Sequence, residues 1–211
     1  MPKKTTPYPG RPREFDESEI LSRIMQLFWE NGYEGTGLSD ILKVTGLGKA
    51  SLYATFGNKQ AMYLKALAHY EEIFVNAAVQ ALTHNSTPAQ DRLHSFLMSP
   101  ITAIEEKGDR KGCFLCNASA DRSSLDEETA KLVRRGYTKM HNALAKTISE
   151  LQDTKDDEET TKAKASLALS VYSGLRVMAR SGVAVETLLA AVDACLSSLC
   201  ETPQRKDQSP R

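Results

Sequence analysis

The spacing of apolar side chains constrains the fold of this chain more than any other feature. Ile20, Ile24 and Phe28 follow one another at intervals of four residues, the spacing that places side chains on one face of an α-helix. The same spacing returns in 167–178. No run of alternating β-branched residues is long enough to indicate a sheet, and no repeat of fixed period indicates a solenoid. The sequence therefore predicts an all-α fold.

Local signals at helix ends divide this pattern into segments. Asp16, Thr87 and Ser124 are each followed three residues later by Glu or Gln, which is a capping box at a helix start. Asn58 is a further candidate cap, and glycines after several segments mark helix ends. The predicted helices cover about 16–31, 38–44, 49–56, 58–82, 88–106, 114–121 and 124–152, followed by two apolar stripes in 159–178 and 185–199.

Composition excludes several classes of protein. The chain has 211 residues, of which 41% are hydrophobic and 26% are charged, a balance typical of a globular protein with a real core. No apolar run approaches the roughly 18 residues that a membrane span needs, and the amino terminus lacks the apolar segment of a secretory signal. Four cysteines are too few for a disulfide scaffold. We therefore expect a cytoplasmic protein with no membrane partner.

Charge is balanced over the whole chain but not at its amino terminus. Basic and acidic residues number 27 each, so any attraction to nucleic acid has to be local. The first 13 residues hold four basic side chains, Arg11 and Arg13 among them, and no acidic one, and their prolines disfavour a helix. We interpret this segment as a flexible basic arm and the polar residues 202–211 as a flexible tail.

The two short helices on either side of Thr45–Gly48 are typical of a helix-turn-helix. Ile41, Leu52 and Phe56 can form a small core with the preceding helix. The other side of the second short helix then carries Lys49, Ala50, Ser51, Tyr53, Ala54 and Thr55. Small residues allow close approach to base edges, and Lys, Ser and Tyr can bind bases or phosphates. The alternative is an ordinary helical hairpin with solvated polar residues, but the basic arm and Lys59 favour DNA binding.

Three segments in this region form a specific combination: Gly10–Arg13, Phe28–Tyr33 and Leu52–Lys59. Together they resemble the amino-terminal signature of the TetR (tetracycline-repressor) family of transcriptional regulators, over about residues 10–65. The resemblance implies a three-helix DNA-binding domain, an all-helical ligand-binding and dimerisation domain, and operator binding as a two-fold dimer. The expected divisions are 1–57 for the arm and DNA-binding domain, 58–201 for the helical domain and 202–211 for the tail.

The same resemblance gives candidates for DNA contact, namely Arg11, Arg13, Thr36, Lys49, Ser51, Tyr53 and Lys59. Tyr53 and Lys59 are expected to bind phosphate, and the two arginines of the arm to reach the minor groove or the backbone. Lys59 has independent support, because it follows a cap at a helix amino terminus, which favours an anion. Gly37 departs from the family pattern, which puts one phosphate contact in doubt, and Thr36 is expected to cap the helix that follows.

Cys113 and Cys116 form a C-x-x-C pair. A zinc site would need two more ligands at suitable spacing, which Cys195 and Cys200 do not offer, and thioredoxin-like chemistry would need a βαβ unit. One interpretation is therefore that the pair packs in the core, as small and often buried residues do.

The alternative for this pair is a sensor of oxidants or electrophiles. Arg110, Lys111 and the predicted helix start would lower the pKa of the Cys113 thiol and so make it more reactive. The segment Gly112–Leu115 also resembles the glycine-cysteine segment of TetR-family members that sense electrophiles or oxidants. In this interpretation Cys113 is the sensor and Cys116 is a resolving thiol.

Signals for an enzyme are missing. The four histidines lack metal-ligand spacing, and neither a glycine-rich phosphate loop nor a nucleophile elbow occurs, so we expect no catalytic residues, no cofactor and no metal. Candidates for lining a ligand pocket are Met98, Tyr137, Met140, Tyr172 and Met178, although such residues also suit a plain core. The last two helices, with Leu188 and Leu196 at contact positions, suit a homodimer interface, but burial within one subunit predicts the same stripe.

The sequence thus predicts a transcriptional repressor that binds double-stranded, palindromic operator DNA as a homodimer. A small-molecule inducer or an electrophile or oxidant signal is expected to release it. Two alternatives stay open at this point: an activator on the same scaffold, or a helical small-molecule binding protein or enzyme in which the helix-turn-helix is incidental.

Overall fold

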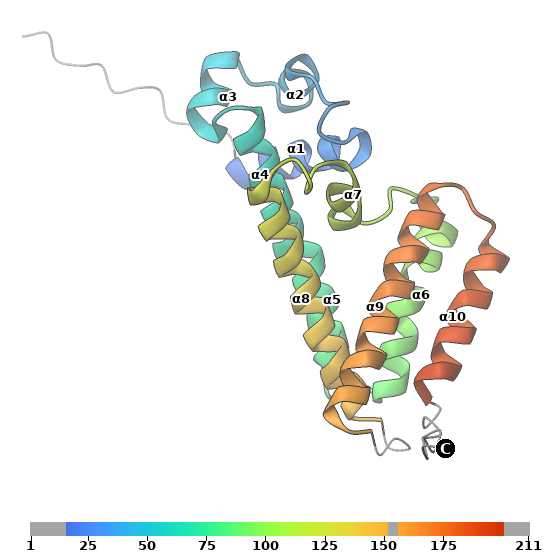
Figure 1. Cartoon of the computed structure of the whole chain (residues 1–211). Helices are drawn as coiled ribbons and strands as arrows, with labels where there is room; N and C mark the ends of the chain where they lie inside the picture. Colours follow the sequence, from blue (N-terminus) through green and yellow to red (C-terminus); the bar gives the residue numbers. More distant parts are fainter. Residues whose placement is uncertain (1–15, 152–155, 201–211) are drawn as a thin grey trace, which may run out of the picture.

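The computed structural model describes residues 16–151 and 156–200, and every regular element in those ranges is helical. The predicted all-α fold is confirmed (Figure 1). The elements are α1 Glu17–Asn31, α2 Leu38–Thr45, α3 Lys49–Phe56, α4 Lys59–Tyr70, the π-helical turn η1 Glu71–Val75, α5 Asn76–Thr83, α6 Ala89–Lys107, α7 Phe114–Asp121, α8 Glu127–Ser149, α9 Glu158–Arg180 and α10 Val185–Cys200.

Three helix starts differ from the predicted capping boxes. Asp16 caps α1 by accepting a bond from the Ser18 N–H at 2.8 Å, while Glu19, its expected partner, pairs with Arg23 at 2.6 Å. At α8 the capping residue is Asp126 and not Ser124. At α6 Pro88 occupies the capping position, so the capping box expected at Thr87 is also wrong.

The long helix predicted from Asn58 to about Leu82 is interrupted. Asn58 caps α4 as expected, because its side-chain oxygen accepts a bond from the Ala61 N–H at 2.9 Å. The helix then widens into the π turn η1 before it continues as α5. The period of the apolar residues does not reveal such a turn, which in other proteins often marks a functional position.

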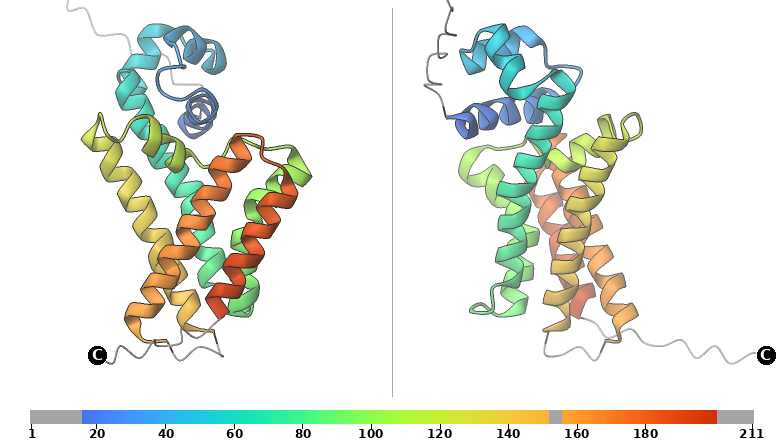
Figure 2. Two further views of the ribbon diagram at one scale, coloured as in Figure 1. Left: turned by 45° about the vertical axis from the view of Figure 1, so that its right-hand side comes forward. Right: turned by 90° about the vertical axis from the view of Figure 1, so that its left-hand side faces the viewer.

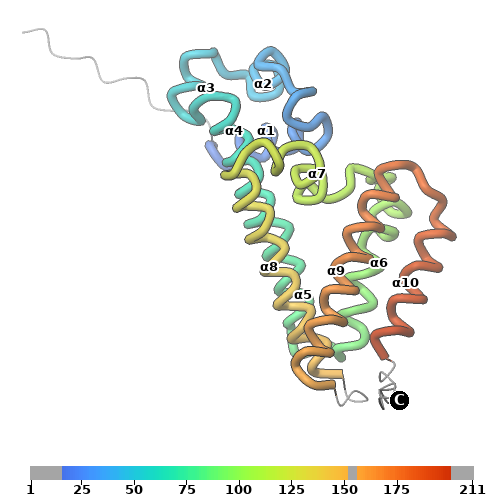
Figure 3. The backbone as a smooth tube through the Cα atoms, viewed as in Figure 1, coloured from blue at the N-terminus to red at the C-terminus, as the bar shows by residue number. Residues whose placement is uncertain are grey.

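The helices form a head and a body. In Figure 1, α1, α2 and α3 form the head at the top, and α4 runs from the head down into the body, where α5 continues it. Figure 2 shows from two other directions that the head lies at one end of the body. In the body α8 packs on α5 and α9, and α6 packs on α9 and α10. The tube in Figure 3 shows α7 beneath the head, near the upper end of α9.

One continuous hydrophobic core joins the head and the body. It includes Ile24 and Phe28 of α1, Leu67 of α4, Phe114 of α7 and Leu175 of α9, each almost completely buried. Because the head shares this core, a rearrangement of the upper body can change the position of α1. Among the described residues, none of the helices is both long and apolar enough to cross a lipid bilayer.

Candidate nucleic-acid interface and cysteine cavity

The predicted helix-turn-helix is present in the head. Ile41 of α2 and Leu52 and Phe56 of α3 are buried in the core, as the spacing of these residues predicts. Gly46 ends α2 with φ 68°, a left-handed conformation that glycine adopts without strain, and its N–H donates to the Leu42 carbonyl at 2.9 Å. The turn therefore fixes α3 on the outer side of the head (Figure 1).

The outer face of α3 carries short side chains between two longer polar ones. Lys49, Ala50, Ser51 and Ala54 are exposed, and Tyr53 is 38% exposed. The Nζ atom of Lys49 lies 5.9 Å from the centre of the Tyr53 ring. A helix with this profile can enter a major groove, because its small residues do not hold the backbone away from the base edges.

Lys59 lies beside this face, at the first turn of α4. Its Nζ atom is 4.4 Å from the centre of the Tyr33 ring, so a cation–π contact orients the ammonium group. The first backbone N–H groups of α4 add partial positive charge at the same place. Both features favour an anion at the start of α4.

Thr36 does not have its expected position. Its side chain is completely buried, and its hydroxyl donates to the Gly32 carbonyl at 2.7 Å. Gly37 is the capping residue of α2, and its N–H donates to the Asp40 carboxylate at 2.9 Å. The hydroxyl of Thr36 is thus used inside the head, and the expected cap is wrong.

Arg11 and Arg13, the two arm residues expected at the DNA, lie outside the described residues. Lys49, Ser51 and Tyr53 share the exposed face of α3, and Lys59 is the first residue of α4, the helix that follows.

The two cysteines of the C-x-x-C pair are buried at the start of α7. Cys113 is 2% exposed and precedes the first residue of α7. The Tyr70 hydroxyl donates to the Cys113 sulfur at 3.5 Å, and the Tyr137 hydroxyl donates to the Cys116 sulfur at 3.4 Å. Both thiols are free.

The two thiols differ in acidity because one proton is shared between them. The Cys116 thiol donates to the Cys113 sulfur and lowers the pKa of Cys113 to about 6, although burial opposes this. The Tyr70 hydroxyl, the Cys116 backbone N–H and the charge of Arg176 act in the same direction. The pKa of Cys116 is raised, since its proton is held by Cys113 and its site is buried. Cys113 is therefore the thiol that ionises first.

The acidity of Cys113 was expected, but its cause is different. Arg110 donates to the carbonyls of Ala179 and Val183, at 3.1 and 3.2 Å, and not to the thiol. Lys111 donates to the Gln26 side chain at 3.0 Å and lies over the Trp29 ring. The cation that acts on the thiol is Arg176, from a helix more than sixty residues further along the chain.

Cys113 lines a cavity of about 270 Å³ between the head and the body. Four aromatic side chains form much of its wall: Trp29, Tyr70, Phe74 and Tyr172. Trp29 belongs to α1, so the cavity reaches the head directly.

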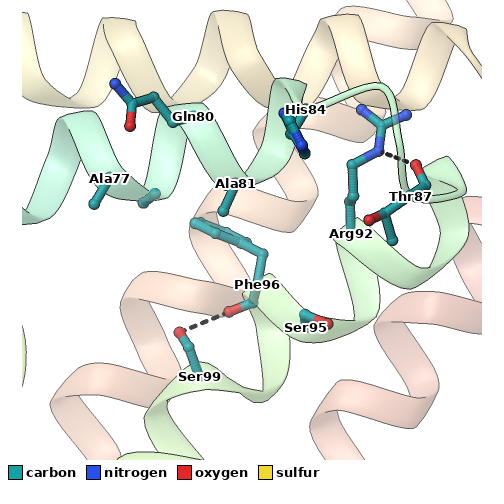
Figure 4. A pocket seen from close by; sticks show the side chains of 10 residues that line it. Ala77, Gln80, Ala81, His84, Thr87, Arg92, Ser95, Phe96 and Ser99 are labelled. Atoms are coloured by element: carbon teal, nitrogen blue, oxygen red, sulfur yellow. Dashed lines mark hydrogen bonds between the residues drawn. The ribbon is translucent and has the colours of Figure 1, made fainter.

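A second, wider cavity of about 590 Å³ opens between α5 and α6 (Figure 4). Ala77, Ala81 and Phe96 point into it, and Arg92 lies at one end, where it donates to the Thr87 carbonyl at 2.8 Å. The two cavities share Ala78 and Ser99 as lining residues. The wider cavity therefore adjoins the one that contains Cys113.

The candidate pocket residues fall into three groups. Met140 and Tyr172 line the cavity that contains Cys113. Met98 lines a separate cavity of about 540 Å³ with His94 and Glu106. Tyr137 and Met178 are half-buried and pack against the core, Tyr137 with its hydroxyl on Cys116.

Two arginines on α9 connect the body to the head, and sequence reasoning missed both. Arg176 lines the Cys113 cavity. Arg180, one turn later, donates to the Trp29 and Glu30 carbonyls at 3.4 and 3.1 Å and to the Lys111 carbonyl at 2.8 Å. These carbonyls include the last ones of α1, where the helix dipole is negative. Basic residues at four-residue spacing after Tyr172 were the only signal for them in the sequence.

Comparison with known proteins agrees with this geometry. Residues 20–66 match the family model of bacterial regulatory proteins of the tetR family. The chain is 31% identical to the uncharacterized HTH-type transcriptional regulator YezE of Bacillus subtilis (strain 168), over 64% of this chain and 69% of YezE. It is 25% identical to the HTH-type transcriptional repressor ComR of Escherichia coli (strain K12), over 85% of this chain and 87% of ComR.

A solved structure of a TetR family regulator is also similar to this chain. A cysteine mutant of the TetR family transcriptional regulator CifR, in complex with a 26-base-pair double-strand operator DNA, superposes with a TM-score of 0.75. It shares 26% sequence identity and covers 90% of this chain and 99% of the CifR chain. A helix-turn-helix head on an all-helical body defines a class of DNA-binding transcriptional regulators, not of enzymes. This chain belongs to the TetR family of that class.

Proposed function

We propose that the chain is a homodimeric repressor that leaves its operator when an electrophile or oxidant modifies Cys113, or when a small molecule fills the cavity around it. One observation carries this proposal: Cys113 and Trp29 line the same cavity, so a group bound there contacts the DNA-binding head. Repression is supported by ComR, a relative that is a transcriptional repressor by name.

The proposed DNA interface consists of α3 and the first turn of α4. Lys49 and Ser51, on the exposed face of α3, would meet base edges, and Tyr53 and Lys59 would bind phosphate. Arg11 and Arg13 would add contacts from the arm. Thr36 is omitted because its hydroxyl is bonded inside the head. The boundary between the domains then lies at residues 57 and 58, where α4 begins.

The proposed dimer interface is formed by α9 and α10. On α9, Leu167 and Val177 are exposed, at 41% and 51%, and the space around Gly174 is open, which lets a partner helix approach closely. On α10, Ala190 and Ala194 are exposed. Two helices from each protomer would form a four-helix interface. Leu188 is fully buried in its own subunit and therefore belongs to the core of the protomer.

The proposed release mechanism is a movement of α1 relative to α9. An adduct on Cys113 would fill the cavity that Tyr70 and Trp29 line and would press on these rings, which pack at 4.9 Å between centres. Displacing Trp29 would shift the end of α1, which Arg180 holds to α9. A shift of the two heads in a dimer changes the distance between their α3 helices, so that they no longer match successive major grooves, about 34 Å apart.

The test is operator release by N-ethylmaleimide. The Cys113 thiolate adds to one alkene carbon of the reagent, and the neighbouring carbon takes up a proton from water. DNA fragments selected by the purified protein serve as the operator, and fluorescence anisotropy measures binding. We expect the reagent to release the wild type and the Cys200→Ser control, which removes the exposed thiol, whereas Cys113→Ser stays bound. Release of Cys113→Ser at the wild-type rate would refute the sensor.

Repression itself is tested separately from sensing. A reporter gene behind the selected operator, in a strain that lacks this protein, should be less active when the protein is restored. Higher activity would identify the activator alternative on the same scaffold.

A further inference from the structure

The guanidinium group of Arg176 lies in the Cys113 cavity without a carboxylate partner. It donates through Nε to the Tyr172 hydroxyl at 3.1 Å and through Nη2 to the Ser99 hydroxyl at 3.2 Å. Across the described ranges, no Asp or Glu forms an ion pair with it. Two other basic residues that reach the interior do have a carboxylate partner: Arg92 pairs with Glu150, and Lys164 pairs with Asp156. A charge removed from water is normally compensated, so Arg176 has capacity for an anion.

The other charged groups that line the cavity do not form a hydrogen bond with the Arg176 guanidinium group. Asp109 lines the cavity, but its carboxylate accepts a bond from the Lys111 N–H at 2.9 Å and lies 3.9 Å from the Lys111 ammonium. Lys107 adds a second cation at the exposed rim. Cys113, with a pKa of about 6, is ionised at neutral pH and offsets part of the charge of Arg176. The two hydrogen bonds of Arg176 go to Tyr172 and Ser99 and not to this thiolate, so its remaining N–H groups can still bind a carboxylate.

The remaining walls are aromatic and apolar. Tyr70 and Phe74 stack at 4.9 Å between ring centres, and Trp29 meets both rings edge to face, at 4.9 and 5.2 Å. Val75 and Met140 complete this side. A cavity of about 270 Å³ is close to the lower limit for small-molecule sites and suits a ligand with one ring.

We propose that this cavity binds an aromatic carboxylate, with its ring among Trp29, Tyr70 and Phe74 and its carboxylate on Arg176. The planar fork of arginine matches a carboxylate and gives short, charge-assisted hydrogen bonds. The Ser99 hydroxyl accepts a bond from Arg176 and donates its own proton to the Phe96 carbonyl at 2.8 Å, so it holds the guanidinium group in place rather than binding the ligand. The inference rests on the proposed function, because it names the class of small molecule that would occupy the cavity beside Cys113.

The experiment compares 3-phenylpropanoate with its neutral amide, 3-phenylpropanamide, on the full-length protein. Trp29 is the only tryptophan of the chain and lines the cavity, so its fluorescence reports binding of both probes. We expect the carboxylate to bind on the order of 10-fold more tightly than the amide. Arg176→Gln should remove this preference and leave the affinity for the amide unchanged. Lys107→Gln, which removes the rim cation, should keep the preference.

Three results would overturn the proposal: equal affinity of the wild type for acid and amide, an unchanged preference in Arg176→Gln, or loss of the preference in Lys107→Gln. If Arg176→Gln does not fold, the acid–amide comparison on the wild type still decides. Neither probe reacts with thiols, so Cys113→Ser should also prefer the acid. Acid binding without operator release would leave the site standing and refute the proposed function of the cavity instead.

Discussion

Cys113 illustrates how one residue depends on its neighbours. Its expected acidity comes from the shared proton of Cys116 and from Tyr70, not from Arg110 and Lys111. The thiol is both buried and acidic, although core packing and a reactive thiol were alternative interpretations of the sequence. The core interpretation describes where the thiol lies, and its lowered pKa is the property that the proposed sensor requires.

Removing the Cys116 thiol should therefore weaken the acidity of Cys113. In the wild type the rate of alkylation by iodoacetamide should rise through a pH of about 6, because the pKa is lowered and the thiolate is present above it. In Cys116→Ala the midpoint should move upward, toward the ordinary value of about 8.5. Mass spectrometry of the peptide that contains Cys113 gives the rate at each pH. Cys195→Ala is the control, and an unchanged midpoint in Cys116→Ala would show that the shared proton is not the cause.

Single substitutions can also test the proposed DNA contacts. Lys59→Ala should weaken binding to all duplexes by a similar factor and reduce the salt slope by about one, since one phosphate contact is lost. Lys49→Ala should instead change the preference among operator sequences. Lys146→Ala, at the exposed end of α8, is the control and should do neither. An unaltered salt slope in Lys59→Ala would mean that α4 does not approach the DNA in the proposed way.

At the scale of elements, the helices were predictable and their interruptions were not. Apolar spacing and caps such as Asn58 are local, so they place α1 to α5 within a few residues. The π turn η1 is stabilised by contacts that are distant in sequence: Glu71 is buried and binds Arg135 and Lys139 of α8 at 2.6 and 2.7 Å. The roles of Arg176 and Arg180 could not be predicted for the same reason. Their partners are distant in sequence and lie on α6, on α1 and in the loop before α7.

The Glu71 cluster should make a measurable contribution to stability. Burial raises the pKa of the Glu71 carboxyl, but bonds from Arg135 and Lys139 outweigh this effect and hold the pKa below its ordinary value. Glu71→Gln should lower the free energy of unfolding by about 2 kcal/mol at neutral pH, since both cations remain partly exposed.

The pH dependence of this contribution has a definite sign. Because the folded pKa is lowered, the stabilisation is present above the unfolded value of about 4.3 and is lost as the pH falls through the folded value. The stabilities that urea titrations give for wild type and Glu71→Gln should therefore approach each other progressively as the pH falls below about 4.3. A constant difference over the whole pH range would contradict the assignment.

At the scale of the whole molecule, the proposed dimer would place two α3 helices on one operator. Val177→Glu should produce monomers with weak operator affinity, because it places a charge on the exposed stripe of α9. Light scattering measures the mass. Leu125→Glu is the matched control, since Leu125 is 75% exposed but lies in the turn before α8, away from that stripe. A stable dimer of Val177→Glu would place the interface elsewhere.

The central claim is that chemistry in the cavity reaches the DNA through the contact between α9 and α1, and Arg180→Gln tests it most directly. Operator affinity is measured for each protein before and after alkylation of Cys113. The wild type should lose affinity on the order of 10-fold or more on alkylation, as expected for allosteric coupling. Arg180→Gln should bind operator well in both states, while the control Arg110→Gln, which bonds α9 and the following turn but not α1, should respond as the wild type does. A full loss of affinity in alkylated Arg180→Gln would contradict the account.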